Sequence, residues 1–152
     1  LKYHKFIQRL GPEPLGNNFN ANYLKNKFSK KESPIKSVLL DQSVVAGLGN
    51  IYVCEALFMS GISPKKTASK ISIKKCEELV RNIRRILISA IEAGGSSLKD
   101  FTDIEGNSGY FQFEFYVYGR DNELCKSNTC NRKIKRISQS GRSSFYCPSC
   151  QR

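Results

Sequence analysis

The last 28 residues of the chain contain four of its six cysteines, in the spacing C-x4-C-x16-C-x2-C. Two close thiol pairs separated by a hairpin-length insert suit one tetrahedral zinc ion, which binds four thiolates at about 2.3 Å. We therefore predict one Zn²⁺ site within a small β-hairpin unit. Its ligands would be Cys125, Cys130, Cys147 and Cys150.

Disulfide bonds are the alternative use of six cysteines, and they are typical of secreted proteins. No signal-peptide pattern opens this sequence, and four of the six cysteines lie in two tight pairs, so zinc is the better interpretation. Cys54 and Cys76 stand alone among apolar residues. We interpret both as small side chains of the core.

The charge balance indicates a polyanionic partner. The chain has 25 Lys and Arg against 13 Asp and Glu, a formal net charge of +12. No apolar run approaches the roughly 20 residues that span a bilayer, so nucleic acid is favoured over a membrane. The alternative is a soluble basic protein with no such partner. Residues 132–142, between the two cysteine pairs, hold five positive charges and no negative one, and Arg142 follows a turn predicted at Ser140-Gly141.

Apolar periodicity predicts that the part before the cysteines is mainly helical. The expected helices cover residues 21–28, a segment that starts at Pro34 with Ser33 as its cap, residues 51–60 with Asn50 as their cap, and residues 72–93. The last of these carries its apolar side chains on one stripe, formed by Ile73, Cys76, Val80, Ile83, Leu87 and Ile91. An aromatic β-strand is expected over residues 110–118.

The sequence Gly47-Leu48-Gly49-Asn50 separates two of the predicted helices. Glycines allow a sharp turn, and the helix N-terminus that follows can bind a phosphate. Asn50, with Lys36 or Lys31, could add contacts to the same phosphate backbone; an ordinary interhelical turn is the alternative. Glu55 lies one turn further on and could touch a substrate base or simply be solvated at the helix surface.

Several segments resemble, in sequence, order and separation, the bacterial formamidopyrimidine-DNA glycosylases. They are LLDQSVVAGLGNIYVCEALF (39–58), GISP (61–64), GGSSLKD (94–100), GYFQ (109–112), VYGR (117–120) and GRSSFYCPSCQR (141–152). The resemblance extends from the Gly-Pro-Glu-Pro turn at residues 11–14 to the end, and it favours the oxidised-purine branch of the family. The first cysteine pair, C-x4-C, departs from the commoner C-x2-C but remains compatible with zinc.

The resemblance implies a mainly α-helical fold, a helix–two-turn–helix bundle followed by a small β-hairpin zinc finger. The expected division is into residues 1–119, with a linker-like start at 1–33 and a lesion-loop region at 96–111, and residues 120–152.

The implied activity is that of a base-excision-repair glycosylase and AP lyase that removes oxidised purines, such as 8-oxoguanine and formamidopyrimidine, from duplex DNA. Arg142 would grip the phosphates that flank the abasic site and act as a proton donor in the second elimination. Lys31, Lys36 and Asn50 would hold phosphates near the lesion. The neighbours of the flipped base would be Glu55, Ser97, Lys99 and Tyr110.

The family's nucleophile is the amine of an N-terminal proline that is followed by glutamate, on a domain that precedes the region matched here. This chain begins with Leu1-Lys2. We therefore expect a carboxy-terminal half that is inactive without its amino-terminal catalytic partner, monomeric, bound to damaged double-stranded DNA rather than to a membrane, and located in the bacterial cytoplasm at the nucleoid. The alternatives are an autonomous zinc-finger nucleic-acid-binding module without catalytic activity and a zinc ribbon that binds RNA or protein.

Overall fold

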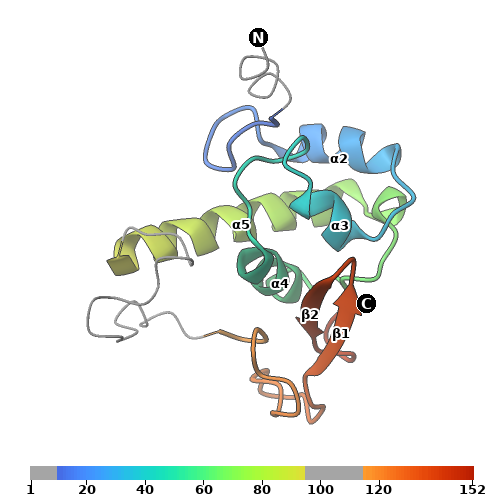
Figure 1. Ribbon diagram of the computed structural model, residues 1–152, viewed down its shortest axis with the longest axis vertical. Helices are drawn as coiled ribbons and strands as arrows, with labels where there is room; N and C mark the ends of the chain where they lie inside the picture. Colours follow the sequence, from blue (N-terminus) through green and yellow to red (C-terminus); the bar gives the residue numbers. More distant parts are fainter. Residues whose placement is uncertain (1–9, 95–114) are drawn as a thin grey trace.

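The computed structural model describes residues 10–94 and 115–152. Their elements, in chain order, are α2 (Ala21–Ser29), α3 (Ile35–Leu40), α4 (Asn50–Met59), η1 (Ala68–Lys70), α5 (Ile73–Gly94), β1 (Lys135–Gln139) and β2 (Arg142–Tyr146). Figure 1 shows α5 running through the middle of the helical part, between α2 and α4, while β1 and β2 form a hairpin near the C-terminus. The predicted fold class, a mainly helical bundle followed by a small β-hairpin, is confirmed.

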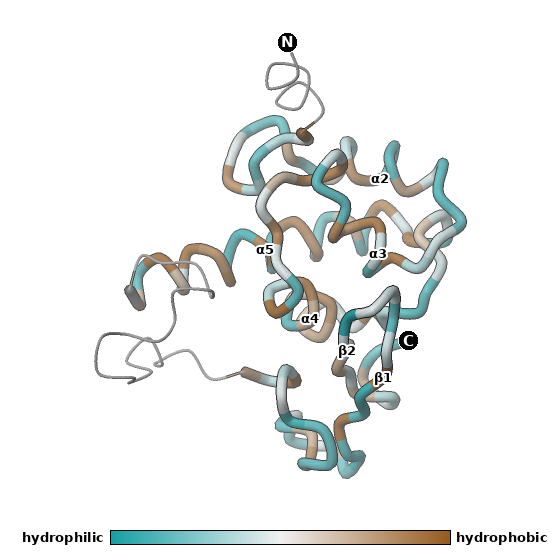
Figure 2. Tube along the Cα trace, viewed as in Figure 1, coloured by the Kyte–Doolittle hydropathy of each residue, from teal (hydrophilic) through white to brown (hydrophobic). Residues whose placement is uncertain are grey.

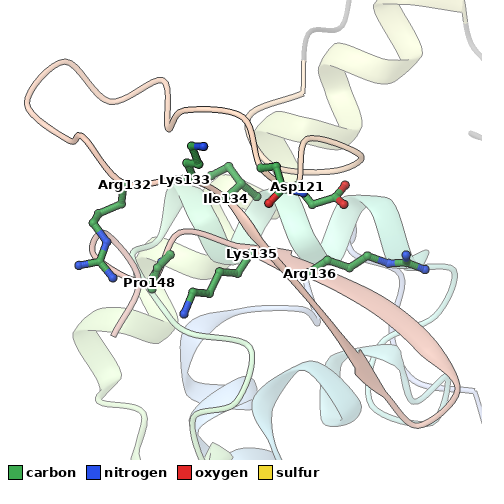
Figure 3. A pocket seen from close by; sticks show the side chains of 8 residues that line it. Asp121, Arg132, Lys133, Ile134, Lys135, Arg136 and Pro148 are labelled. Carbon is green, nitrogen blue, oxygen red and sulfur yellow. The ribbon is translucent and has the colours of Figure 1, made fainter.

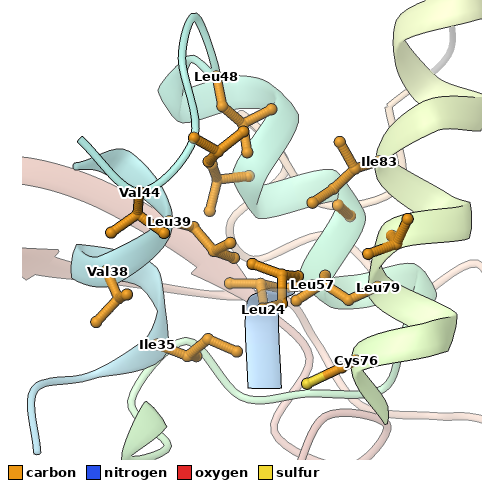
Figure 4. Packing of buried hydrophobic residues seen from close by; sticks show 14 of the residues in the cluster. Leu24, Ile35, Val38, Leu39, Val44, Leu48, Leu57, Cys76, Leu79 and Ile83 are labelled. Atoms are coloured by element: carbon orange, nitrogen blue, oxygen red, sulfur yellow. The ribbon is translucent and has the colours of Figure 1, made fainter. Parts of the chain in front are cut away.

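The main core lies where α2, α4 and α5 meet. Leu24, Leu57 and Leu79, one from each helix, are fully buried, and their side chains point into one cluster (Figure 4). Cys76 is buried in the same cluster, as the sequence predicted. In Figure 2, hydrophobic and hydrophilic residues alternate along α5.

Helix α5 follows its predicted bounds to within one residue, but its apolar stripe is buried only in the middle. Val80 and Ile83 are in the core, whereas Ile73 and Ile91, at the two ends, are 42% and 54% exposed. The helix is longer than the bundle that it supports, and its C-terminal end projects past α4 (Figure 1). The predicted apolar stripe is therefore buried only along the middle of α5.

Helices α2 and α3 begin in different ways. Asn20 caps α2, since its side-chain oxygen accepts a hydrogen bond from the N–H of Tyr23 at 2.9 Å. The predicted Ser33 cap of α3 is wrong, because the residue before this helix is Pro34 and it makes no side-chain cap. The segment before α3 is paired with residues 66–68 instead, and the N–H of Ala68 donates to the carbonyl of Ser33 at 2.9 Å.

Helix α4 is buried on nearly all sides, because a cluster packs against each of its two faces. Val53 and Leu57 face the main core, whereas Cys54 belongs to a second cluster with residues of the C-terminal unit. Burial of Cys54 is thus confirmed. The predicted Asn50 cap is wrong: Gly49 precedes the helix, Asn50 is its first residue, and its side chain is turned toward the hairpin.

The hairpin forms where it was predicted, but the described end of the predicted aromatic strand, residues 115–118, is not a strand. Gln139 pairs with Arg142 across the turn, and Ser140 and Gly141 have φ angles of 51° and 79°. Positive φ at both central residues is the two-residue turn that matches the twist of a hairpin. The predicted strand over residues 110–118 is wrong within the described part, since residues 116–118 form bends and a turn.

No helix within residues 10–94 and 115–152 is long and apolar enough to cross a membrane.

Candidate metal centre and nucleic-acid interface

The four cysteines of the predicted zinc site come together at the base of the hairpin. The Sγ atoms of Cys125 and Cys150 are 3.8 Å apart, those of Cys130 and Cys147 are 3.6 Å apart, and all four lie within 4.8 Å of one another. Four sulfurs at the zinc–thiolate distance form a tetrahedron with edges of about 3.8 Å. The arrangement therefore fits one Zn²⁺ with four thiolate ligands.

Hydrogen bonds from the surrounding chain hold the two ligand pairs in place. Gln151, which is 3% exposed, accepts from the N–H of Cys147 at 2.7 Å and donates to the carbonyl of Ile62 at 2.9 Å. The N–H of Cys125 donates to the carbonyl of Arg132 at 2.9 Å. Gln151 was not predicted from the sequence; its only signal was its position directly after Cys150.

Burial raises the pKa of the Cys125 thiol and that of the Cys150 thiol. A bound divalent cation inverts this effect, because a coordinating thiol is deprotonated outright. The ligand set is therefore suited to a metal ion that supplies positive charge at the centre of the four sulfurs.

The opposite end of the hairpin contacts the start of α4 and the buried face of α3. The carbonyl oxygen of Ser143 accepts two hydrogen bonds, one from Nδ2 of Asn50 at 3.0 Å and one from Nζ of Lys36 at 3.0 Å. Nζ of Lys36 also donates to Oγ of Ser144 at 2.5 Å. Ser143 is the neighbour of Arg142, so three residues singled out from the sequence come together here, at the tip of the hairpin.

Lys36 is nearly inaccessible, with 1% of its surface exposed. Burial lowers the pKa of its ammonium group, and the like charge of Arg142 lowers it further. Lys36 and Arg142 line the same hollow of about 220 Å³, between α3 and the hairpin turn. Its remaining lining residues are Ser37, Leu40, Asp41, Gln139 and Ser140.

The turn before α4 differs from expectation in its use of glycine. Gly47 has a φ of 76°, in the left-handed region, and its N–H donates to the side chain of Gln42 at 2.7 Å. Gly49 has a φ of −87°, a conformation that is open to other residues. The Oδ1 atom of Asn50 is buried without a hydrogen-bond partner, so this side chain retains an unused acceptor beside the helix start.

Lys31 is exposed after α2 and does not enter the hollow as a lining residue. The pKa of the Asp41 carboxyl is lowered, mainly by hydrogen bonds from Ser43. The positive charge of Lys31 lowers this pKa further. Its charge therefore acts on Asp41, one of the residues that line the hollow.

Glu55 is not a solvated surface residue, because it is only 1% exposed. Its carboxylate accepts hydrogen bonds from the backbone N–H groups of Tyr116, Val117 and Tyr118. The other predicted neighbours of a flipped base, Ser97, Lys99 and Tyr110, lie outside the described residues.

A second hollow, of about 440 Å³, lies on the zinc-site side of the hairpin (Figure 3). Arg132, Lys133, Lys135 and Arg136 line it, together with Asp121, Asn122, Ile134 and Pro148. These four cations belong to the basic stretch noted in the sequence. Their side chains point in different directions (Figure 3), so they form a positive surface rather than one pocket for a single ion.

Two family matches cover most of the chain. Residues 10–102 match the formamidopyrimidine-DNA glycosylase H2TH domain, and residues 128–152 match the zinc finger found in FPG and IleRS. With the cysteine tetrahedron, they define a helix–two-turn–helix protein with a zinc finger. The chain belongs to the formamidopyrimidine-DNA glycosylase family, as the motifs indicated.

Relatives and solved structures agree with this assignment. The chain is 56% identical to the formamidopyrimidine-DNA glycosylase of Ruegeria pomeroyi and 58% identical to that of Roseobacter denitrificans, over 98% of this chain and 53% of each relative. The crystal structure of MutM (Fpg) from Thermus thermophilus matches with a TM-score of 0.85 and 36% identity, over 99% of this chain and 56% of that one.

The Lactococcus lactis enzyme, solved non-covalently bound to DNA that contains an AP site, matches with a TM-score of 0.82 and 35% identity, over 100% of this chain and 54% of that one. This chain thus spans about half the length of the relatives that it matches.

Proposed function

We propose that this chain is the DNA-binding carboxy-terminal part of a base-excision-repair glycosylase and AP lyase that removes oxidised purines from duplex DNA. The observation that supports this most directly is the meeting of Lys36, Asn50 and Arg142 around Ser143. It brings the guanidinium of Arg142 and the amide of Asn50 to one edge of a zinc-finger hairpin, where the buried ammonium of Lys36 holds the backbone of Ser143.

The proposed reaction explains why such a grip is needed. An enzyme that excises a base must first rotate it out of the stack, and this costs a few kcal/mol in a duplex. Contacts to the phosphates on both sides of the lesion offset that cost. Arg142 and Asn50 are suited to this, since guanidinium and amide groups donate hydrogen bonds to phosphate oxygens. Related Lactococcus lactis enzymes were solved with DNA containing an abasic site or FAPY-dG.

Arg142 would also donate the proton of the second elimination, and Lys31 would contact the DNA backbone. The loop region 96–111, with Ser97, Lys99 and Tyr110, would cover the flipped base. The functional units would be residues 1–119 and 120–152. The protein would act as a monomer on the bacterial nucleoid, with its nucleophile supplied by an amino-terminal catalytic half.

Duplex binding tests the DNA-gripping role. The affinity of the chain for a duplex with an abasic-site analogue, measured by fluorescence anisotropy over a salt series, should exceed its affinity for single-stranded RNA. Arg142→Ala should weaken binding and reduce the slope of log K against log salt by about 0.9, the share of one phosphate contact. Arg81→Ala removes the same charge from an exposed position on α5. Equal effects of the two substitutions would mean that net charge alone drives binding.

Borohydride trapping tests where the chemistry resides. A duplex with 8-oxoguanine should give no covalent product with this chain, because the nucleophile is proposed to belong to the other half. A covalent product on that duplex would contradict this division.

A further inference from the structure

Glu55 is a buried carboxylate at which three consecutive backbone amides converge. Its Oε1 accepts from the N–H of Tyr116 at 2.6 Å, and its Oε2 accepts from those of Val117 and Tyr118, both at 2.9 Å. Successive N–H groups of a β-strand point to opposite sides, so they cannot reach one carboxylate. The turn at residues 115–118 is thus a backbone concavity that binds an anion, and the anion is supplied by α4.

The surroundings of the carboxylate make this a strong link. Hydrogen bonds to an ionised acceptor are roughly twice as strong as neutral ones, and a partly satisfied buried network is costly. Burial raises the pKa of Glu55, while its three amide partners and the charge of Lys126 oppose that rise. The carboxylate and the turn therefore depend on each other.

Neighbouring side chains of α4 hold the same turn. The ring of Phe58, one turn after Glu55, stacks on the ring of Tyr116 with centroids 5.3 Å apart. Cys54 packs with the fully buried Val117 in the second cluster, which also contains Cys125 and Cys147 of the zinc site. Three positions of α4 thus attach this turn and the metal centre to one helix.

Asn50 begins the same helix, five residues before Glu55. At 1.5 Å per residue the two lie about 7.5 Å apart along its axis. Residue 115 follows closely in sequence on the region 96–111, for which a role at the flipped base was predicted. Through this helix, Glu55 therefore relates residues 116–118 to the end of α4 that is proposed to contact phosphates.

We propose that Glu55 is a positioning residue for lesion recognition, which sets where residues 115–118 lie relative to Asn50 and the zinc site without itself touching the base. This rests on the proposed function. It also gives Glu55 a different task from the base contact that the sequence resemblance implied. The partner of its carboxylate is the chain's own backbone, and its effect on the lesion is indirect.

Glu55→Gln tests this with little change of shape. Its amide oxygen can accept two of the three bonds, but its NH₂ group then faces the N–H of Tyr116. We compare the affinity for a duplex with an abasic-site analogue with the affinity for an undamaged duplex. The ratio of the two should fall by about tenfold or reach one, because the buried N–H of Tyr116 loses its acceptor. Zinc content and salt slope should stay at the wild-type values, since the metal ligands and phosphate contacts are intact. Glu77→Gln, an equal charge change at an exposed site of α5, should leave the ratio unchanged.

Hydrogen–deuterium exchange at residues 115–118 separates positioning from a purely structural role. Faster exchange together with a lower affinity ratio supports the proposal, and faster exchange with an unchanged ratio overturns it. If Glu55→Gln does not fold, Phe58→Leu provides a second test, because it removes the aromatic stacking on Tyr116. An unchanged affinity ratio in that variant also overturns the proposal. A wild-type chain that binds no duplex would contradict the proposed function itself.

Discussion

The side-chain amide of Asn50 donates a hydrogen bond to the carbonyl oxygen of Ser143 at 3.0 Å, although 93 positions separate the two residues in sequence. This bond joins the first residue of α4 to the strand that begins at Arg142. Asn50 and Arg142 are the two residues proposed to donate hydrogen bonds to phosphates. The bond to Ser143 therefore fixes their relative position before any DNA is bound.

Asn50→Ala should weaken binding to an abasic-analogue duplex by about tenfold, the upper end of the effect of one lost hydrogen bond. Both its link to Ser143 and its proposed phosphate contact are removed. Titration by fluorescence anisotropy measures the effect, with Asn26→Ala at an exposed position of α2 as the control. If Asn50→Ala bound the duplex with wild-type affinity, Asn50 would not contact phosphate, and its role would be limited to the hydrogen bond with Ser143.

Zinc removal should disorganise the C-terminal unit. Native mass spectrometry is expected to find one zinc ion per chain, and Cys147→Ala should lose it. Structural zinc in small fingers contributes about 10–16 kcal/mol of apparent binding free energy, so the variant should also unfold at a lower temperature. Cys76→Ala is the matched control, because Cys76 is buried in the main core and is not a member of the four-cysteine cluster. Retention of zinc by Cys147→Ala would contradict the ligand assignment.

The buried ammonium group of Lys36 should make stability depend on pH. Its pKa is lowered in the folded state, chiefly by burial, so the unfolded chain binds more protons between that lowered value and the ordinary value of about 10.4. Stability contributed by this group therefore rises with pH across that window and is at its lowest below it. The difference in unfolding free energy between wild type and Lys36→Met, from urea titrations at several pH values, should increase as pH rises. Lys30→Met controls for loss of one charge at an exposed position, and a flat difference for Lys36→Met would refute the prediction.

Gly11→Ala should destabilise the fold, because a Cβ atom at this position would lie 2.5 Å from the carbonyl oxygen of Val44. That carbonyl belongs to the backbone and also accepts a hydrogen bond from the Tyr23 hydroxyl at 2.5 Å, so it cannot move freely. Overpacking of this kind costs about 1–3 kcal/mol. Thermal unfolding measures it, and Gly16→Ala, whose Cβ would meet its nearest atom at 3.4 Å, should have a much smaller effect. Equal melting temperatures for the two variants would show that the loop yields.

Features that depend on local chemistry could be predicted from the sequence. The cysteine spacing indicated the metal ligands, Ser140-Gly141 indicated the hairpin turn, and apolar periodicity gave α5 to within one residue. In each case the residues concerned are close along the chain, or the chemistry of one residue type dominates the outcome.

Tertiary structure decided the partners of individual polar side chains. Asn50 is a good helix cap by type, yet it is turned toward Ser143, and Glu55 has the pattern of a surface residue but is enclosed by residues 116–118. Residues 115–118, three of them aromatic, favour a strand by composition, but the amides of residues 116–118 converge on Glu55 and exclude one. A hydrogen bond between distant segments depends on where the packed helices bring them, and periodicity and spacing carry no information about that. The sequence by itself therefore determined the zinc ligands, the hairpin and the helical class. Only the packing of α4 between two clusters decided which polar groups meet. The physical reason is that a buried donor or acceptor must take the partner that the fold brings within reach.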